Sequence, residues 1–376
     1  MVSITFRIRQ ALYFAAAARC GSIFASPGLP KRQFSVYMLP ITMMTPPRRK
    51  TRQLKHEMQN GEEMSKPEIL LIGPYPAWDI EPLEHDYIVH RLWEARDRDA
   101  LIAEVAPRIR GVATRGELGA KAALIDALPA LEIISCYGVG TDAIDLVRAR
   151  TRGVQVANTP DVLTKDVADM ALALILALLR KIPQGDAYVR SGKWTAGNMD
   201  LGVSLTGKTV GILGFGRIGR AVAQRAAAFE TAILYSDLAP APDAAYAFYP
   251  DAAALAKASD ILVVTVAGGA ATKNIVDAQV LAALGPKGVL INVARGATVD
   301  EAALVDALSA GSIGGAGLDV FWNEPNIDQR LLDFSNVIVQ PHQSSGTVET
   351  RRAMGRLVRD NLAAHFSGRP LLTPVV

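Results

Sequence analysis

Cysteine is almost absent from this chain of 376 residues. Its two cysteines, Cys20 and Cys136, lie far apart and form no Cys-X-X-Cys pair. The spacing predicts neither a disulfide framework nor a zinc site, and it favours a reducing compartment such as the cytoplasm. Long apolar runs are missing too, since none approaches the roughly 20 residues that a membrane-spanning helix needs. We therefore expect no bound metal and no membrane partner.

Acidic residues are absent before Glu57, although the formal net charge of the whole chain is only +3. Residues 1–63 hold ten basic and three acidic residues, so this segment carries +7 and the rest of the chain −4. An arginine-rich, acid-poor N-terminus fits a mitochondrial transit peptide. We favour a start of translation at Met58 or Met64, because a strand-like apolar run follows directly. On either interpretation we expect residues 1–65 to form a disordered extension.

Basic residues show no pattern typical of nucleic-acid binding. The arginines of the N-terminal segment belong to no predicted fold, and the rest of the chain has no basic run with interleaved aromatic residues. Aromatic residues make up only 6% of the sequence, whereas hydrophobic residues make up 50%. In a chain of this length that content is enough for two buried cores. We expect two domains and no nucleic-acid partner.

Short apolar runs alternate with helix-like segments along the chain. The predicted strands span residues 69–72, 111–113, 133–136, 154–157, 209–213, 232–237, 261–266, 289–293, 315–320 and 337–340. Such alternation is typical of α/β folds with parallel sheets between helices. A long helix, capped by Asp161 or Thr164, is predicted to separate the two α/β units. An amphipathic helix over residues 347–366 comes after the last strand, and we expect it to return to the first unit.

A turn of the form Gly-X-Gly-X-X-Gly follows an apolar strand in the second unit. Gly214 permits the tight turn, Gly216 lets phosphates approach the backbone, and Gly219 lets the following helix pack closely on the strand. That helix directs unpaired N–H groups and the positive end of its dipole at a pyrophosphate. Asp237 ends the next strand 18 residues after Gly219, where a ribose-binding carboxylate is expected. The sequence therefore predicts a dinucleotide site.

Three polar residues each lie just past a predicted strand downstream of this turn: Arg295, Glu324 and His342. Taken singly, each fits an ordinary surface or turn position. Together they suit the reduction of a 2-oxo acid, because arginine can bind the substrate carboxylate through two N–H groups. A histidine can donate a proton to the carbonyl oxygen while a hydride arrives from the nicotinamide. A neighbouring glutamate stabilises the imidazolium that donates this proton.

The chain resembles the D-isomer-specific 2-hydroxyacid dehydrogenases, and within them the glyoxylate/hydroxypyruvate reductase branch. The resemblance covers about residues 67–375. It rests on motifs that occur in order at residues 137–142, 158–169, 210–219, 292–296, 317–325 and 341–342. The resemblance implies an NAD(P)H-dependent reductase of hydroxypyruvate or glyoxylate in which Arg295, Glu324 and His342 form the catalytic set.

The resemblance also implies how the chain is divided. Family members have two Rossmann- or flavodoxin-like, doubly wound parallel-sheet domains, and the cofactor domain interrupts the substrate domain. Here the expected substrate domain comprises residues 66–162 and 346–376, and the expected NAD(P)-binding domain comprises residues 163–345. Family members pair mainly through the cofactor domain, so we expect a homodimer.

The same resemblance assigns binding residues. The backbone N–H groups of Val139 and Gly140 would hold the substrate carboxylate, with Arg115 and Gly116 beside it. The expected cofactor contacts lie in the glycine turn and at neighbouring strand ends: Thr164, Gly214, Phe215, Gly216, Arg217, Ile218, Gly219, Ser236, Asp237, Val266, Val293 and Asp319.

Two specificities stay open at this point. The carboxylate of Asp237 repels the 2′-phosphate of NADP and can bind the bare ribose hydroxyl, which favours NADH. NADPH remains an alternative, since Asp237 lies one residue later than usual and Ser236 can accept a phosphate. The residues after His342, Gln343-Ser344-Ser345, depart from the family pattern, so D-lactate or another 2-hydroxy acid remains an alternative substrate. A nucleotide-sensing protein of the same fold, without catalysis, is the alternative from another class.

Other residues are predicted to be structural. Cys136 is expected to be a buried thiol rather than a reactive one. Trp194 and Trp322 are expected to be packing residues. Trp322 lies between Asp319 and Glu324 in the sequence, so the active site or a partner subunit is an alternative place for its side chain. The remaining histidines have no partner at the spacing of metal ligands.

Overall fold

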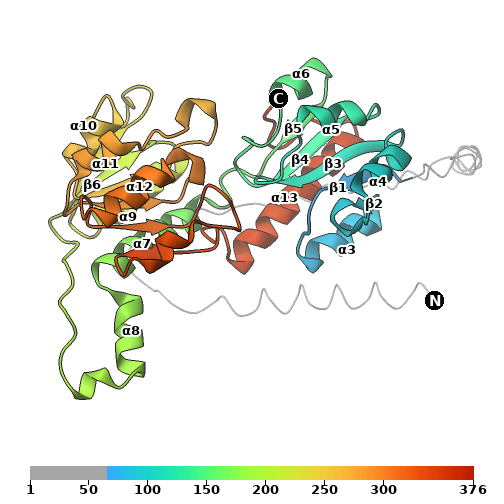
Figure 1. Cartoon of the computed structure of the whole chain (residues 1–376). Helices are drawn as coiled ribbons and strands as arrows, with labels where there is room; N and C mark the ends of the chain where they lie inside the picture. The colour runs from blue at the N-terminus through green and yellow to red at the C-terminus, as the bar shows by residue number, and fades with distance from the viewer. Residues whose placement is uncertain (1–65) are drawn as a thin grey trace, which may run out of the picture. The chain divides into compact units, whose positions relative to one another are not determined.

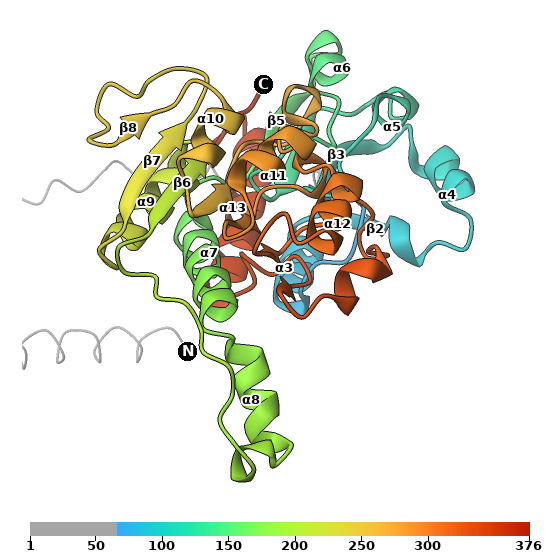
Figure 2. The same cartoon turned by 60° about the vertical axis from the view of Figure 1, so that its left-hand side comes forward.

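The computed structural model of the protein describes residues 66–376 (Figure 1). Residues 1–65, for which the sequence predicts a disordered extension or a transit peptide, lie outside the described residues. The described chain contains two parallel β-sheets flanked by helices (Figures 1 and 2). The prediction of an α/β protein with two doubly wound parallel sheets is confirmed.

The first sheet has five strands in the order β2-β1-β3-β4-β5. Its strands are β1 (Glu68–Leu71), β2 (Ile88–Arg91), β3 (Ile109–Arg115), β4 (Ile133–Tyr137) and β5 (Gln155–Ala157). Neighbouring strands are parallel throughout. All five residues of β4 are buried, as a central strand covered on both faces requires. The strand order reverses between β1 and β3, and the carboxyl ends of strands at such a point are where α/β folds bind ligands.

The helices of this half are α3 (Ala77–Asp86), α4 (Arg98–Val105), α5 (Ala122–Ala127) and α6 (Leu146–Thr151), with the short 3-10 helix η1 (Leu92–Glu94). Strand β2 and helix α3 were missed by the sequence analysis. The edge strand β2 is covered less well than β4, since Ile88 is exposed and none of its residues is fully buried. Its His90-Arg91 end also breaks the apolar run that marks a buried strand.

The second sheet has seven strands in the order β12-β11-β10-β9-β6-β7-β8. They are β6 (Thr209–Leu213), β7 (Ala232–Ser236), β8 (Ala247–Phe248), β9 (Ile261–Val264), β10 (Val289–Asn292), β11 (Gly315–Leu318) and β12 (Val337–Val339). All strand pairs are parallel. Here the strand order reverses between β6 and β9, so the turn after β6 lies at the edge where a nucleotide binds.

The helices of the second half are α7 (Thr164–Leu179), α8 (Ile182–Arg190), α9 (Arg217–Ala227), α10 (Ala252–Lys257), α11 (Ala278–Leu284) and α12 (Glu301–Ser309). Short 3-10 helices add η2 (Lys193–Thr195), η3 (Ala270–Thr272), η4 (Gly296–Thr298) and η5 (Gln329–Asp333). Helices α7 and α9 pack side by side, and α10, α11 and α12 form a second row (Figure 2). Among residues 66–376 no helix has both the length and the apolar character to cross a membrane.

The predicted cap of α7 is wrong. The helix begins at Thr164, its N-cap residue is Leu163, and no side chain caps it. Asp161 instead adopts a left-handed conformation with φ 67° and forms an ion pair with Arg217, 2.9 Å from Nε to Oδ1. By contrast, α10, α11 and α12 are capped by aspartate, as the preference of helix N-termini for short acceptors predicts.

The last helix, α13 (Val348–Phe366), packs against β4 and α3 of the first sheet, as the sequence predicts (Figure 1). The hydroxyl of Ser135 donates to the carbonyl of Val358 at 3.2 Å. Buried Asp79 on α3 forms an ion pair with Arg359 on α13. The last helix therefore packs on the first sheet, so this half is built from two separate segments of the chain. The boundaries 66–162, 163–345 and 346–376 stay predictions.

Candidate active site

The glycine turn joins β6 to α9. Gly214 has φ 96°, and a Cβ atom there would lie 2.7 Å from the backbone nitrogen of Val266 at the end of β9. A Cβ atom at Gly219 would lie 2.1 Å from the carbonyl oxygen of Gly214. Side chains are therefore excluded at both positions, by backbone conformation at one and by close packing at the other. At Gly216, in contrast, a Cβ atom would meet nothing within 4 Å, so the backbone faces open space.

The start of α9 suits an anion. Gly216 is the N-cap residue, and no side chain caps the helix. The first N–H groups of a helix have no partner within it, and they carry the positive end of the helix dipole. The open space at Gly216 and the uncapped helix thus fit the pyrophosphate of a dinucleotide, with the N–H groups of Arg217 and Ile218 as its expected donors.

Asp237 lies at the end of β7, beside this turn. Its Oδ2 accepts a hydrogen bond from the backbone N–H of Phe215 at 2.6 Å, and its Oδ1 accepts one from Leu238 at 2.7 Å. The ring of Phe215 is buried and stacks on Tyr235, with the centroids 4.2 Å apart. Phe215 therefore faces the site with its backbone rather than its ring. The side chain of Ser236, the other candidate at this position, is buried.

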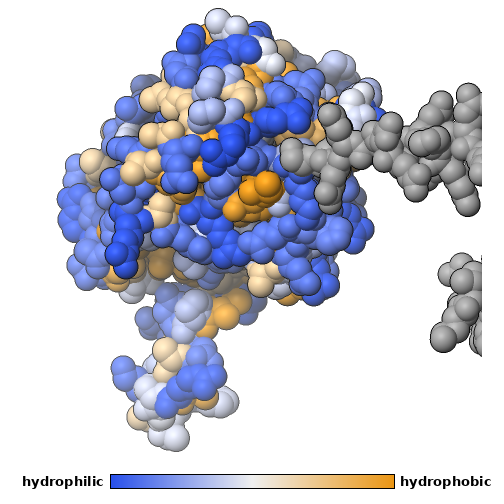
Figure 3. Space-filling model, turned by 90° about the vertical axis from the view of Figure 1, so that its right-hand side faces the viewer, coloured by the Kyte–Doolittle hydropathy of each residue, from blue (hydrophilic) through white to orange (hydrophobic). Residues whose placement is uncertain are grey.

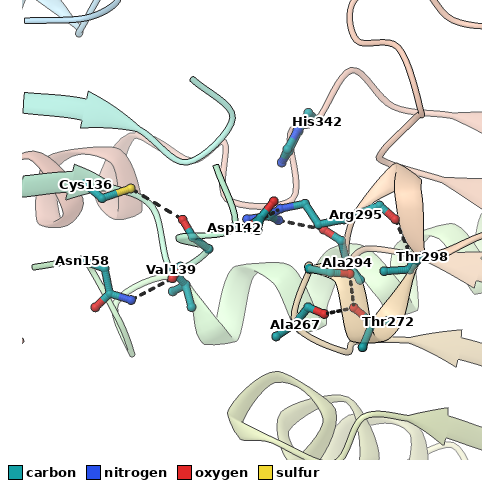
Figure 4. A network of polar contacts seen from close by, with 12 residues as sticks. Cys136, Val139, Asp142, Asn158, Ala267, Thr272, Ala294, Arg295, Thr298 and His342 are labelled. Carbon is teal, nitrogen blue, oxygen red and sulfur yellow. Dashed lines mark hydrogen bonds and ion pairs between the residues drawn. The ribbon is translucent and has the colours of Figure 1, made fainter. Parts of the chain in front are cut away.

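The three candidate catalytic residues follow three neighbouring strands. Arg295 comes after β10, Glu324 after β11 and His342 after β12. Nδ1 of His342 lies 2.7 Å from Oε2 of Glu324, and Oε1 of Glu324 accepts the backbone N–H of Phe321 at 2.9 Å. Figure 4 shows the His342 ring directed toward Arg295 and Asp142. The structure thus brings together side chains that are up to 47 residues apart in the sequence.

The environment of Glu324 keeps it ionised. Burial by itself raises the pKa of this carboxyl, but the hydrogen bond and the charge of His342 lower it, and with two smaller contributions they bring the pKa below its ordinary value. The backbone N–H of Phe321 and the charge of Arg295 act in the same direction. A carboxylate held in the charged form can stabilise a positive charge on the adjacent imidazole.

The loop that carries His342 is held by Asp319. His342 has a left-handed backbone with φ 54°, and its N–H donates to the carbonyl of Asp319 at 2.9 Å. The Asp319 carboxylate accepts the N–H groups of Gln343 and Ser344 at 2.7 and 2.9 Å. Burial raises the pKa of Asp319, and these N–H groups offset the effect only in part. Asp319 was expected to contact the cofactor, which stays a prediction; here both of its oxygens hold the histidine loop.

Arg295 is oriented by neighbours from both sheets. Its Nη1 donates to the carbonyl of Ala294 at 2.8 Å, and its Nε donates to Oδ1 of Asp142 at 3.2 Å (Figure 4). A Cβ atom at Gly140 would lie 1.7 Å from Nη2, and one at Gly116 would lie 3.7 Å from it. The structure therefore brings Gly116, Gly140 and Arg295 together, as the sequence predicts for a substrate site.

In the loop at residues 138–140 the carbonyl groups accept hydrogen bonds from neighbouring residues. The amide of Asn158 donates to the carbonyl of Val139 at 2.7 Å, and the thiol of Cys136 points at the carbonyl of Gly140 from 3.6 Å (Figure 4). The N–H groups of Val139 and Gly140 donate to no other group of the described chain. Two backbone donors thus remain available for an anion.

The remaining predicted binding residues are placed around the glycine turn and the neighbouring strand ends. Nε of Arg115 is 2.6 Å from Oε1 of Glu117, so its charge is partly matched already. Val266 touches the glycine turn, and Thr164 begins α7. The N–H of Val293 donates to Val264 at 3.4 Å, past the end of β10. Which of these atoms meet substrate or cofactor stays a prediction.

The residues predicted to be structural divide into two groups. Cys136 is fully buried, and burial raises the pKa of its thiol to about 12, so it stays protonated and unreactive as predicted. Trp322 donates to the carbonyl of Val299 at 2.6 Å and lies under Lys273, but it is 42% exposed, so it packs only in part. The prediction for Trp194 is wrong, because its side chain is 65% exposed on η2. Within residues 66–376 no cluster of three or more metal-ligating side chains is present.

Sequence reasoning missed two residues that shape the site. Asp142 belongs to the motif at residues 137–142 but was given no role, and Asn158 was noted only as the start of a motif. Their partners, Arg295 and Val139, are respectively 153 and 19 residues away in the chain. The presence of both residues in family motifs was the one signal that could have singled them out.

Two parallel sheets, a glycine turn at a reversal of strand order, and an arginine, glutamate and histidine at adjacent strand ends define the class of dinucleotide-dependent oxidoreductases. Residues 172–344 match the model of the D-isomer specific 2-hydroxyacid dehydrogenase NAD-binding domain. The chain belongs to the D-isomer specific 2-hydroxyacid dehydrogenase family, and it is an oxidoreductase that uses a nicotinamide cofactor.

Relatives cover nearly the whole described chain. A glyoxylate/hydroxypyruvate reductase A of Arabidopsis thaliana is 49% identical over 308 residues, which is 82% of this chain and 98% of the relative. A 2-ketogluconate reductase of Gluconobacter oxydans is 48% identical over 83% of this chain and 99% of its own length. The crystal structure of an NADPH-dependent glyoxylate/hydroxypyruvate reductase from Sinorhizobium meliloti, with NADP and malonate, has 47% identity and a TM-score of 0.79 and covers 83% of this chain and 97% of that chain.

Proposed function

We propose that this protein reduces small 2-oxo acids, with hydroxypyruvate and glyoxylate as its preferred substrates, to 2-hydroxy acids of D configuration. The observation that carries the proposal is the pairing of His342 with Glu324 at 2.7 Å beside Arg295. Relatives that are named as reductases of 2-oxo acids support this substrate class and count against a sensor without catalysis.

The substrate carboxylate would bind between the two halves of the site. Among the described residues Arg295 donates through Nε to Asp142 and through Nη1 to Ala294, so Nη2 is left over. It lies over Gly140, whose N–H is also available. One guanidinium N–H and the two backbone N–H groups of Val139 and Gly140 can hold the two oxygens of a carboxylate. A carboxylate bound there leaves the 2-oxo group on the side of His342.

The proton for the alcohol would come from His342. Its Nδ1 is engaged by Glu324, so its other nitrogen, Nε2, is the donor that can face the substrate. When bound, the reduced nicotinamide supplies a hydride to C2 of the substrate. His342 gives its Nε2 proton to the carbonyl oxygen in the same reaction, and Glu324 stabilises the imidazolium before the transfer. The products are the 2-hydroxy acid, neutral histidine and the oxidised cofactor.

The cofactor would be held by the glycine turn, Asp237 and the ends of the neighbouring strands. We propose a preference for NADH, because Asp237 places a carboxylate beside the turn and like charges repel the 2′-phosphate of NADP. The buried hydroxyl of Ser236 is a poor phosphate ligand, which supports the same preference. The relative from Sinorhizobium meliloti is named as NADPH-dependent, so the cofactor ratio must be measured rather than carried over from relatives.

A homodimer is proposed from the segment after α7. Helix α8 and the 3-10 helix η2 have no buried residue and protrude beyond α7 (Figures 1 and 2). Apolar colour appears among polar residues on this segment at the bottom of Figure 3. Its exposed apolar side chains are Ile182, Val189, Trp194, Leu201 and Val203. Such a patch favours burial against a second copy. Light scattering during gel filtration should give twice the mass of the chain, and a monomer would contradict the proposal.

Initial rates test the proposed function. Hydroxypyruvate, glyoxylate, pyruvate and 2-ketogluconate are each supplied with NADH and with NADPH, and the absorbance of the reduced cofactor is followed. We expect fast turnover of hydroxypyruvate or glyoxylate, with NADH preferred. Faster turnover of pyruvate or 2-ketogluconate would assign another 2-oxo acid. Absence of turnover with all four in protein that binds NADH would contradict the proposal.

A further inference from the structure

Asp142 is the strongest candidate for a further role, because it is the charged neighbour of the arginine that would anchor the substrate. It lies in the loop after β4 of the first sheet, whereas Arg295 follows β10 of the second. The two residues are 153 positions apart in the chain, and Oδ1 of Asp142 accepts the Nε–H of Arg295 at 3.2 Å. Both side chains are about one quarter exposed.

We propose that Asp142 is a positioning residue that turns the Arg295 guanidinium so that Nη2 faces the substrate carboxylate. This inference rests on the proposed function. A guanidinium is planar and rigid, so fixing two of its nitrogens fixes the third. Nη1 is held by the carbonyl of Ala294 and Nε by Asp142 (Figure 4). The nitrogen that remains, Nη2, is the one above Gly140.

Two glycines provide the space that the pair occupies. A Cβ atom at Gly268 would lie 2.7 Å from Cγ of Arg295 and 3.0 Å from Cγ of Asp142. On the opposite side, a Cβ atom at Gly140 would lie 1.7 Å from Nη2 and 2.8 Å from Oδ1 of Asp142. Glycines from both halves of the chain therefore leave room for the paired side chains, and a side chain at either glycine would displace the pair.

The charge of Asp142 and its hydrogen bond act in opposite directions on the substrate. The carboxylate repels the substrate carboxylate and partly neutralises Arg295, so the charge alone weakens substrate binding. The hydrogen bond to Nε orients the guanidinium, and a misplaced anchoring group costs up to about 100-fold in rate. The orienting effect is therefore the reason we assign Asp142 a positive role, and the two effects can be separated by substitution.

Two substitutions of Asp142 separate the effect of its charge from the effect of its hydrogen bond. Asp142→Asn removes the charge and keeps an oxygen that can accept the Nε–H, whereas Asp142→Ala removes both. Asp145→Ala is the matched control: Asp145 lies in the same loop and caps α6 by accepting the N–H of Arg148 at 2.8 Å. Loss of this cap weakens the start of α6 but leaves Arg295 untouched.

Binding and kinetics are measured together. Oxamate, which carries a carboxylate beside an amide carbonyl, is titrated into each enzyme with NADH bound, and the NADH fluorescence is followed. KM and kcat are measured with hydroxypyruvate. For Asp142→Ala we expect the Kd of oxamate and the KM to rise on the order of 10- to 100-fold, more than kcat falls. For Asp142→Asn both constants should stay within about threefold of the unsubstituted enzyme, since the orienting bond is retained.

Three results would overturn the proposal. Unchanged oxamate binding and KM in Asp142→Ala would show that Arg295 needs no orienting partner. Equal losses in Asp142→Asn and Asp142→Ala would assign the effect to charge, and an equal loss in Asp145→Ala would assign it to loosening of the loop. Failure of the proposed function is distinguishable, because an unsubstituted enzyme that binds oxamate yet reduces none of the 2-oxo acids would contradict the reaction and leave the comparison of oxamate affinities intact.

Discussion

The two halves of the molecule contribute to the site in different ways. The seven-stranded half supplies charged side chains, since Arg295, Glu324 and His342 follow β10, β11 and β12. The five-stranded half supplies mainly backbone, through Val139 and Gly140 in a loop whose carbonyl groups are tied down. The seven-stranded half therefore carries groups that can transfer a proton, whereas the backbone N–H groups of the five-stranded half can only hold an anion.

This difference determines which substitutions each half tolerates. A side chain that exchanges a proton has no substitute among most residue types, so its loss should abolish the chemical step. A backbone donor survives any substitution that keeps the main chain in place, so the loop at residues 138–140 is sensitive to side-chain volume rather than to residue type. The two halves should thus respond to mutation with different kinetic signatures.

His342→Ala should have the largest effect, and it tests the proton donor of the seven-stranded half. We expect kcat to fall on the order of 100-fold or more, because no other group donates the proton, while the Kd of NADH stays unchanged. The measurement is steady-state kinetics with NADH binding followed by fluorescence. His85→Ala, at an exposed histidine on α3, is the control and should retain full turnover. Near-normal turnover of His342→Ala would show that His342 is not the proton donor and that the seven-stranded half does not differ from the other half in this respect.

Gly140→Ala tests the anion-binding loop of the five-stranded half. The new methyl group would overlap Nη2 of Arg295, from which it would be 1.7 Å away, so the guanidinium must move. We expect kcat/KM for the 2-oxo acid to fall about tenfold or more while NADH affinity is kept. Gly197→Ala is the matched control, because a Cβ atom there meets nothing within 4 Å. If both variants behave alike, volume at Gly140 does not matter and the anchoring role is wrong.

Asp237→Ala concerns the seven-stranded half alone and tests whether the choice of cofactor can be altered without loss of catalysis. Removing the carboxylate should lower the ratio of kcat/KM with NADH to kcat/KM with NADPH by about tenfold. This change corresponds to about 1.4 kcal/mol of free energy. Asp251→Asn removes the same charge 14 residues away at the cap of α10 and should leave the ratio unchanged. An unaltered ratio in Asp237→Ala would show that Asp237 does not face the ribose.

Glu132→Gln should have the smallest effect and concerns stability of the five-stranded half. Glu132 accepts hydrogen bonds from Arg110 at 2.7 and 3.0 Å and contacts His365 at 2.9 Å. The hydrogen bond from Arg110 holds the pKa of Glu132 below its ordinary value despite partial burial. Because the folded pKa is the lower one, this carboxylate stabilises the fold above the unfolded pKa of about 4.3 and loses that effect as the pH falls through the folded pKa.

The measurement for Glu132→Gln is the midpoint of thermal unfolding at pH 7 and at pH 3. The midpoint should be slightly lower than that of the unsubstituted protein at pH 7, and the difference should shrink at pH 3. Glu81→Gln, at an exposed position of α3, is the control. A difference that grows as the pH falls would contradict the sign of the pKa shift.

Much of the seven-stranded half could be predicted from the sequence. Strands β6, β9 and β10 are buried along nearly their whole length, so each appears as a continuous apolar run. The glycine turn has the spacing that its sterics demand, since Gly214 and Gly219 tolerate no Cβ atom. The five-stranded half was predicted less completely, because its edge strand β2 is partly exposed and lacks such a run.

Local sequence patterns predict the α/β architecture, the dinucleotide turn and the residue types of the candidate catalytic set, because burial and backbone sterics leave their mark on neighbouring residues. Which of these groups meet depends on the folded chain. The hydrogen bond between Asp142 and Arg295 joins positions 153 residues apart, and the exposure of Trp194 follows from a segment that packs on neither sheet. Such contacts leave no local pattern, since they arise only when distant strand ends are brought to one edge.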